Sequence, residues 1–128
     1  MSSEKGHQQT IFGVLGDILA GNPVTQWELY VDGASRGNPG KSGAGIHLLF
    51  QKKTILKKGF FLGEHTNNEA EYLALFIGVY FLKLKKKDSE SVSIISDSQL
   101  LVRQMQGKYK IKKAELKVLQ GAIEKELV

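Results

Sequence analysis

The stretch from Tyr30 to Gly40 constrains the fold more than any other part of the chain, because it joins a strand pattern to a dense turn. Before the turn, the apolar residues Trp27, Leu29 and Val31 alternate with more polar neighbours, and this period of two predicts a strand with one buried face. Residues 33–40 contain three glycines, an asparagine and a proline, a composition that lets backbone N–H groups approach a ligand closely. The carboxylate of Asp32 beside this turn suits a metal or phosphate site. A hairpin turn with a solvated Asp32 is the alternative.

The segments around this turn predict three strands that follow one another in the chain. Strands are expected over residues 26–34, 43–50 and 54–62, with a short turn at 51–53. Because short turns join successive strands, the three strands are expected to form an antiparallel meander.

A capped helix and a further strand follow the meander. Thr66 and Glu69 have the spacing of a capping box, and the apolar-rich run after them predicts a helix over 70–84. Residues 92–95 form a β-branched run that is reached through this helical crossover, so the strand is expected to lie parallel to the strand it joins. Helices are expected over 98–106 and 112–127. The pattern indicates an α/β fold in which three antiparallel strands are followed by a parallel one.

The first part of the chain differs from the rest. Residues 1–24 are expected to form an N-terminal extension, and residues 25–128 a single domain of ordinary size. In the extension, the apolar residues of the segment 10–20 fall on one helical stripe, and a Gly-Asn-Pro sequence follows as a stop. This spacing predicts a short amphipathic helix; its apolar residues are Ile11, Phe12, Leu15, Ile18 and Leu19.

Composition excludes several classes of protein. The chain contains no cysteine, which excludes disulfides and thiolate metal sites. No apolar run approaches the roughly 20 residues that a membrane-spanning helix needs, and Asp17 interrupts the only stretch that resembles the core of a signal peptide. We therefore expect a cytoplasmic protein without a membrane partner.

The charge balance favours a polyanionic partner. The formal net charge is +5 and the isoelectric point lies near 9.4, and lysines that neutralise phosphates give a salt-dependent affinity for nucleic acid. The lysines gather at 52–53, 57–58, 83–87 and 108–113. Solvated faces of helices and turns are the alternative explanation for each of these clusters.

Three carboxylates are expected to converge. Glu71 falls on the apolar stripe of the helix at 70–84, where a charged group needs a partner. The helix N-terminus or one lysine is the alternative to a partner in a functional site. Asp97 follows the strand at 92–95, at the sheet edge where α/β proteins bind ligands. Together with Asp32, these are hard oxygen ligands without a histidine or cysteine cluster, and they suit Mg²⁺, with Mn²⁺ as a second possibility.

Three segments of the chain resemble the signature segments of type 1 ribonuclease H, in the same order and with similar spacing: 32–40, 66–72 and 96–99. The resemblance extends from about residue 26 onward. It implies a ribonuclease H-like mixed sheet flanked by helices, and Mg²⁺-dependent cleavage of the RNA strand of RNA/DNA hybrids. It also implies that Asp32, Glu71 and Asp97 are metal-binding catalytic residues. By the same resemblance, residues at the hybrid's backbone and minor groove would be Gly33, Asn38, Thr66, Asn67, Asn68 and Gln99.

The chain departs from this family at its end. The family pattern continues with another parallel strand and a last helix that carries a fourth acid, whereas no aspartate follows Asp97 here. Glu115, Glu124 and Glu126 do not match the missing motif. The fold is therefore expected to be shortened at its C-terminal side.

The shortening leaves several hypotheses open. The strand at 92–95 would be an exposed edge, which a second copy of the chain could cover. Alternatively, the N-terminal helix could take over part of the packing of the missing helix. The function would be an active hybrid-specific ribonuclease, or a binding module of the same fold with little activity, or a fragment that needs a second chain. A related nuclease that acts on DNA is a further possibility, against which the residues suited to 2′-hydroxyl contacts argue.

Overall fold

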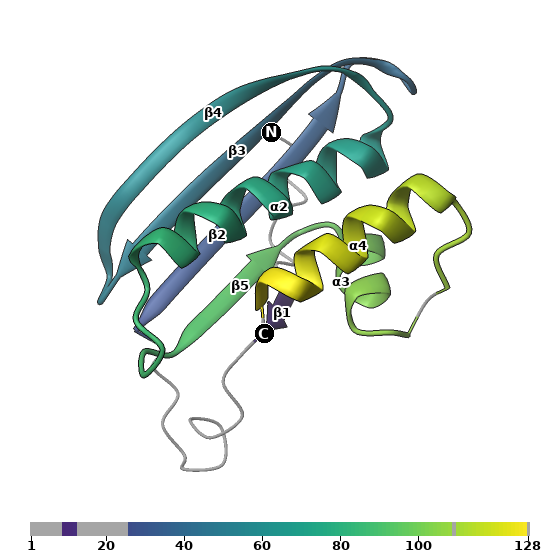
Figure 1. The fold of residues 1–128 in the computed structure, drawn as a ribbon. Coiled ribbons are helices and arrows are strands. Elements are labelled where there is room, and N and C mark those ends of the chain that lie inside the picture. The colour runs from purple at the N-terminus through teal and green to yellow at the C-terminus, as the bar shows by residue number, and fades with distance from the viewer. Residues whose placement is uncertain (1–8, 13–25, 109, 128) are drawn as a thin grey trace.

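The computed structural model describes residues 9–12, 26–108 and 110–127. A five-stranded sheet with the strand order β1-β5-β2-β3-β4 forms its centre (Figure 1). In chain order, the elements are β1 (Gln9–Phe12), β2 (Trp27–Ser35), β3 (Gly40–Phe50), β4 (Lys53–His65), α2 (Asn67–Lys85), β5 (Val92–Ser96), α3 (Gln99–Met105) and α4 (Ala114–Leu127). None of these helices is long and apolar enough to cross a membrane.

The sheet has the mixed arrangement that the sequence predicts. Strands β2, β3 and β4 form an antiparallel meander, and β5 pairs with β2 in parallel through the crossover helix α2. The last parallel pair joins Tyr30 to Ile95; β5 ends at Ser96, whereas β2 continues to Ser35. The prediction of three antiparallel strands followed by a parallel one is confirmed.

Helix α2 covers the apolar face of the meander. In β2 the buried residues alternate with half-buried ones, so that Leu29 and Val31 face α2 while Tyr30 and Asp32 face away from it. In Figure 1, α2 runs along the sheet and α4 lies beside α2. The core between these layers is apolar, and its largest fully buried members include Leu29, Leu48, Leu75, Ile94, Leu101 and Ile123.

Two glycines allow α2 to lie unusually close to β2. A Cβ atom on Gly33 would lie 2.2 Å from the carbonyl oxygen of Ala70 in the first turn of α2. A Cβ atom on Gly78 would lie 2.9 Å from a methyl group of Val31. No side chain larger than hydrogen fits at Gly33 without moving the backbone, so this contact fixes the distance between the strand and the start of the helix.

A buried polar network joins the three helices. The hydroxyl of Tyr72 donates to the side chain of Gln104 at 2.7 Å, and the Nε2 of Gln120 donates to the carbonyl oxygen of Gln104 at 3.2 Å. Burial raises the pKa of Tyr72 to about 12, so the phenol is protonated and serves as a hydrogen-bond donor. Helix α3, which follows Asp97, is therefore held to α2 and α4.

The prediction of a helix that begins at residue 10 is wrong for residues 10–12. These residues belong to β1, which pairs antiparallel with β5 and joins Gln9 to Ser96. The rest of the predicted helix lies outside the described residues. The helical stripe misled because a short apolar segment fits a strand equally well, and the open edge of β5 offers backbone partners that satisfy it. Since β1 occupies this edge, the reason for expecting a second copy there is removed.

Gly33→Ala is expected to destabilise the protein by about 3 kcal/mol, because the added methyl group meets backbone atoms that cannot rotate away. Urea denaturation measures the change. Gly45→Ala is the matched control, since a Cβ atom on Gly45 has nothing within 4 Å. Equal stability of the two variants would contradict the close contact.

Deleting residues 1–12 is expected to speed hydrogen exchange at those amides of β5 that face β1, because their backbone partners are removed. The control is deletion of residues 1–8, which keeps β1. Exchange that is the same in both truncated proteins would show that β1 does not protect β5.

Candidate metal centre

Three carboxylates from three different elements come together at the carboxyl end of β5. Asp32 lies on β2, Glu71 in the first part of α2, and Asp97 directly after β5. One oxygen of each lies within 4.8 Å of the others, and each residue is partly buried. This is the convergence that the sequence pattern anticipates.

Two structural features produce the convergence. In the parallel pair of β2 and β5, Tyr30 is opposite Ile95, and Asp32 and Asp97 each follow two residues later. The second feature is the contact at Gly33, where an added Cβ atom would lie 2.5 Å from the backbone nitrogen of Glu71. The register aligns the two aspartates, and the close packing of α2 brings Glu71 to them.

The donor set fits a divalent cation. Three carboxylates this close repel one another unless positive charge lies between them, and hard oxygen ligands are those that Mg²⁺ and Mn²⁺ prefer. Oε2 of Glu71 is buried. Because a carboxylate oxygen is costly to remove from water, a cation bound beside it would offset that cost. Within the described residues, the cluster contains three acids. Glu126 on α4 is not one of them, and its Oε2 lies 3.5 Å from Nζ of Lys83.

An open groove of about 490 Å³ gives access to the two aspartates from the sheet face turned away from α2. Asp32 and Asp97 line one part of it, and Gly45, His47 and Lys57 line others. Positive charge therefore lies on the same groove as the acids, which suits a substrate that carries phosphates.

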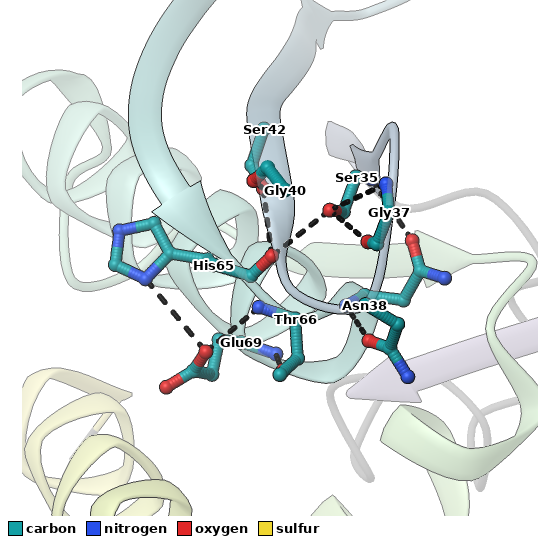
Figure 2. A network of polar contacts seen from close by, with 9 residues as sticks. Ser35, Gly37, Asn38, Gly40, Ser42, His65, Thr66 and Glu69 are labelled. Atoms are coloured by element: carbon teal, nitrogen blue, oxygen red, sulfur yellow. Dashed lines mark hydrogen bonds and ion pairs between the residues drawn. The ribbon is translucent and has the colours of Figure 1, made fainter.

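The turn after β2 is hydrogen-bonded to the start of α2 (Figure 2). Oδ1 of Asn38 accepts from the backbone nitrogen of Asn67 at 3.0 Å, and Oδ1 of Asn67 accepts from that of Ser35 at 2.9 Å. Because both amide oxygens serve in these bonds, the NH₂ groups are what Asn38 and Asn67 can offer to a ligand. Asn68, the next residue of α2, is partly buried.

Two serines that the sequence analysis does not single out complete this arrangement. The hydroxyls of Ser35 and Ser42 lie 2.9 and 3.2 Å from the carbonyl oxygen of His65, at the end of β4. Ser35 also contacts the carbonyl oxygen of Gly37, and Figure 2 shows both serines converging on His65. They tie the glycine-rich turn to the residue that precedes Thr66. Only their position beside the turn, at the end of β2 and the start of β3, could have suggested this role.

The predicted capping box is present at the start of α2. Oγ1 of Thr66 accepts from the backbone nitrogen of Glu69 at 3.1 Å, and the backbone nitrogen of Thr66 donates to Oε1 of Glu69 at 2.7 Å. This donated bond is the main reason that the pKa of Glu69 lies below its ordinary value of 4.5, and His65 adds a smaller effect. The hydroxyl oxygen of Thr66 therefore caps the helix.

Gln99 and Gly33 differ in what they can present. Gln99 is exposed at the start of α3, and with its amide oxygen toward Arg103 it accepts from Nε at 3.1 Å and from Nη2 at 2.6 Å. This orientation leaves the NH₂ group of Gln99 to face a ligand. Gly33 is buried against α2, so the structure gives it a packing role.

Comparison with protein families and known proteins supports one family. The protein-family model described as RNase H matches residues 24–127 of this chain. The chain is 41% identical over 88 residues to the ribonuclease H of Syntrophus aciditrophicus, which covers 68% of this chain and 47% of that protein. It is 37% identical over 87 residues to the bifunctional protein Rv2228c of Mycobacterium tuberculosis, which covers 66% of this chain and 23% of that protein. The chain thus spans less than half the length of these two relatives.

A solved structure shares the fold. The chain matches LC11-RNase H1, a protein isolated from compost by a metagenomic approach, in its complex with an RNA/DNA hybrid. The TM-score is 0.72 at 38% identity, and the match covers 78% of this chain and 75% of the other.

The capping box predicts a pH dependence of stability. Because the folded-state pKa of Glu69 is lowered, its contribution is complete above about pH 4.5 and is lost as the pH falls through the folded-state value. Glu69→Gln is expected to cost about 0.5 kcal/mol at pH 7 and clearly less at pH 3, as urea denaturation at both values would measure. Glu124→Gln, on the exposed side of α4, is the control. A cost that does not shrink at low pH would be inconsistent with an ionised cap.

Proposed function

Because the chain belongs to the ribonuclease H family, we propose that it hydrolyses the RNA strand of RNA/DNA hybrids in a reaction that depends on a divalent metal ion. The observation that carries the proposal is the carboxylate cluster, whose ligand oxygens lie within 4.8 Å of one another beside the turn and the start of α2. Mg²⁺ is the proposed ion, with Mn²⁺ as a possible replacement.

Asp32, Glu71 and Asp97 would hold the ion and act as the catalytic residues. When bound, such an ion lowers the pKa of a water molecule and stabilises the oxygen that leaves in phosphodiester cleavage. The protein's own part is to keep three negative groups in fixed positions on β2, α2 and β5, so that little reorganisation is needed when substrate binds.

The hybrid would lie along the turn after β2 and the first residues of α2 and α3. The NH₂ groups of Asn38, Asn67 and Gln99 are neutral donors, which can bond 2′-hydroxyls and minor-groove acceptors without repelling phosphate. Thr66, Asn68 and the backbone at Gly33 are proposed to complete this surface. The lysines that line the groove beside Asp32 and Asp97 add an attraction for phosphate that does not depend on the nucleotide sequence.

A binding module with little cleavage is the second candidate. The observation that favours it is the number of acids, since the described residues bring three carboxylates to the site and the glutamates of α4 stay outside the cluster. A related possibility is that a second chain supplies what the site lacks. The first candidate is preferred, because a cluster of negative charges beside a phosphate-binding surface weakens binding unless a cation neutralises it.

The domain boundary and the cellular location are also proposals. We propose that residues 25–128 form the catalytic domain and that residues 1–24 are an extension, of which β1 joins the sheet. A cytoplasmic location is proposed from the sequence without cysteine.

The test is cleavage of a labelled RNA/DNA hybrid with Mg²⁺ and with Mn²⁺. Asp32→Asn, Glu71→Gln and Asp97→Asn are each expected to lower the rate by about 10²-fold or more, because each removes a charge that holds the ion. Calorimetric titration with the metal alone should show weaker binding in the same variants.

The controls distinguish the candidates. Duplex DNA should not be cleaved, and Glu115→Gln on α4, outside the cluster, should keep the wild-type rate. Salt-sensitive binding of the hybrid without cleavage in either metal would instead support the binding module.

A further inference from the structure

A second groove lies next to the metal centre, on the face of the sheet turned away from α2. Ala34 and Gly43 form its floor, and Arg36, Lys41 and Phe61 line its sides, around a volume of about 410 Å³. Ala34 follows Asp32 by two residues on the same face of β2, which is a distance of about 7 Å along the strand. We call this hollow the Phe61 groove.

Phe61 is the most exposed large apolar side chain of the described residues, at 76%. Its exposure follows from its neighbours on the same face: the residue opposite it on β3 is Gly43, and the residue two places earlier on β4 is Gly59. Neither has a side chain to cover the ring. Phe60, the adjacent residue, points to the other face and packs against the core. Most of the Phe61 side chain is therefore open to a ligand.

Positive charge borders this ring. Arg36 and Lys41 are both exposed and line the groove, and they are brought together by the backbone bond from the nitrogen of Arg36 to the carbonyl oxygen of Lys41, at 2.9 Å. The nearest acid in the register is Glu64, which is opposite Lys41 on β4 and does not line the groove. An open aromatic ring beside two cations matches a base and its phosphate.

We propose that the Phe61 groove binds an unpaired nucleotide, in a single-stranded extension of the nucleic acid whose paired part lies at the metal centre. The base stacks on Phe61, and the phosphate binds between Arg36 and Lys41. This inference rests on the proposed function and adds to it a preference for hybrids that carry a single-stranded extension.

A second copy of the chain is the other occupant that an exposed ring on an edge strand could take. The charges argue against it, because a two-fold contact that brought the two Phe61 rings together would also bring Arg36 and Lys41 of both copies together. The same cations attract a nucleic-acid strand.

The experiment measures binding by fluorescence anisotropy, in protein that carries Asp97→Asn so that cleavage is too slow to disturb the measurement. The probes are a blunt hybrid and hybrids with a four-nucleotide extension at each of the four ends in turn. At least one extended hybrid is expected to bind about tenfold more tightly than the blunt one, since one stacked base contributes about 1–3 kcal/mol. Phe61→Ala should abolish this difference and leave the affinity for the blunt hybrid unchanged.

Matched variants separate stacking from general effects. Tyr80→Ala removes another exposed aromatic ring, on α2, and should have no effect. Arg36→Gln and Lys41→Gln should reduce the advantage of the extension and its salt dependence, whereas Glu64→Gln should increase the advantage. In a Phe61→Trp variant, the extended hybrid should quench the new fluorescence and the blunt hybrid should not, against a background from the buried Trp27.

Equal affinity for blunt and extended hybrids, or an equal loss on both in Phe61→Ala, would overturn the inference. So would sedimentation showing a dimer that Phe61→Ala dissociates, because the ring would then serve a second copy. The binding measurement does not depend on cleavage. An inactive wild-type protein would therefore contradict the proposed function, while the comparison of blunt and extended hybrids would still test the Phe61 groove.

Discussion

The close contact between Gly33 and the first turn of α2 is the constraint on which the rest of the structure depends. An added Cβ atom there would lie 2.2 Å from a backbone oxygen, so the strand and the helix touch with nothing between them. Asp32 precedes Gly33 on β2, and Glu71 follows Ala70 on α2. The contact therefore holds these two residues near each other. A helix that rested on larger side chains, at the usual separation, would carry Glu71 away from the sheet. The positions of the carboxylates in the cluster therefore depend on how α2 packs against β2.

Much of this arrangement follows from the sequence because its causes are local. The alternation in β2 predicts which face Asp32 occupies, and the capping box at Thr66 fixes where α2 begins. The crossover rule makes β5 parallel to β2, and the parallel register then places Asp97 beside Asp32. Each step depends on a few neighbouring residues or on one general rule of handedness.

The parts that the sequence does not reveal depend on partners distant in the chain. Nothing near residues 9–12 indicates that their partner is the edge of β5, and their apolar spacing fits a helix as well as a strand. The bonds of Ser35 and Ser42 to His65 require the end of β4 to be in place. The exposure of Phe61 follows from the glycine that the register places opposite it, and a shift of one residue would have buried the ring.

The position of β1 has a consequence for the order in which the chain can fold. Its residues are made before those of the other strands, but their pairing partner in β5 is made only after the meander and α2. β1 can therefore pair with β5 only after the chain has been made as far as Ser96. A four-residue strand at one edge of the sheet is expected to open more readily than the strands inside it. Since the first residue of β1, Gln9, pairs with Ser96, this opening would loosen the end of β5 next to Asp97 and leave β2 and α2 in place.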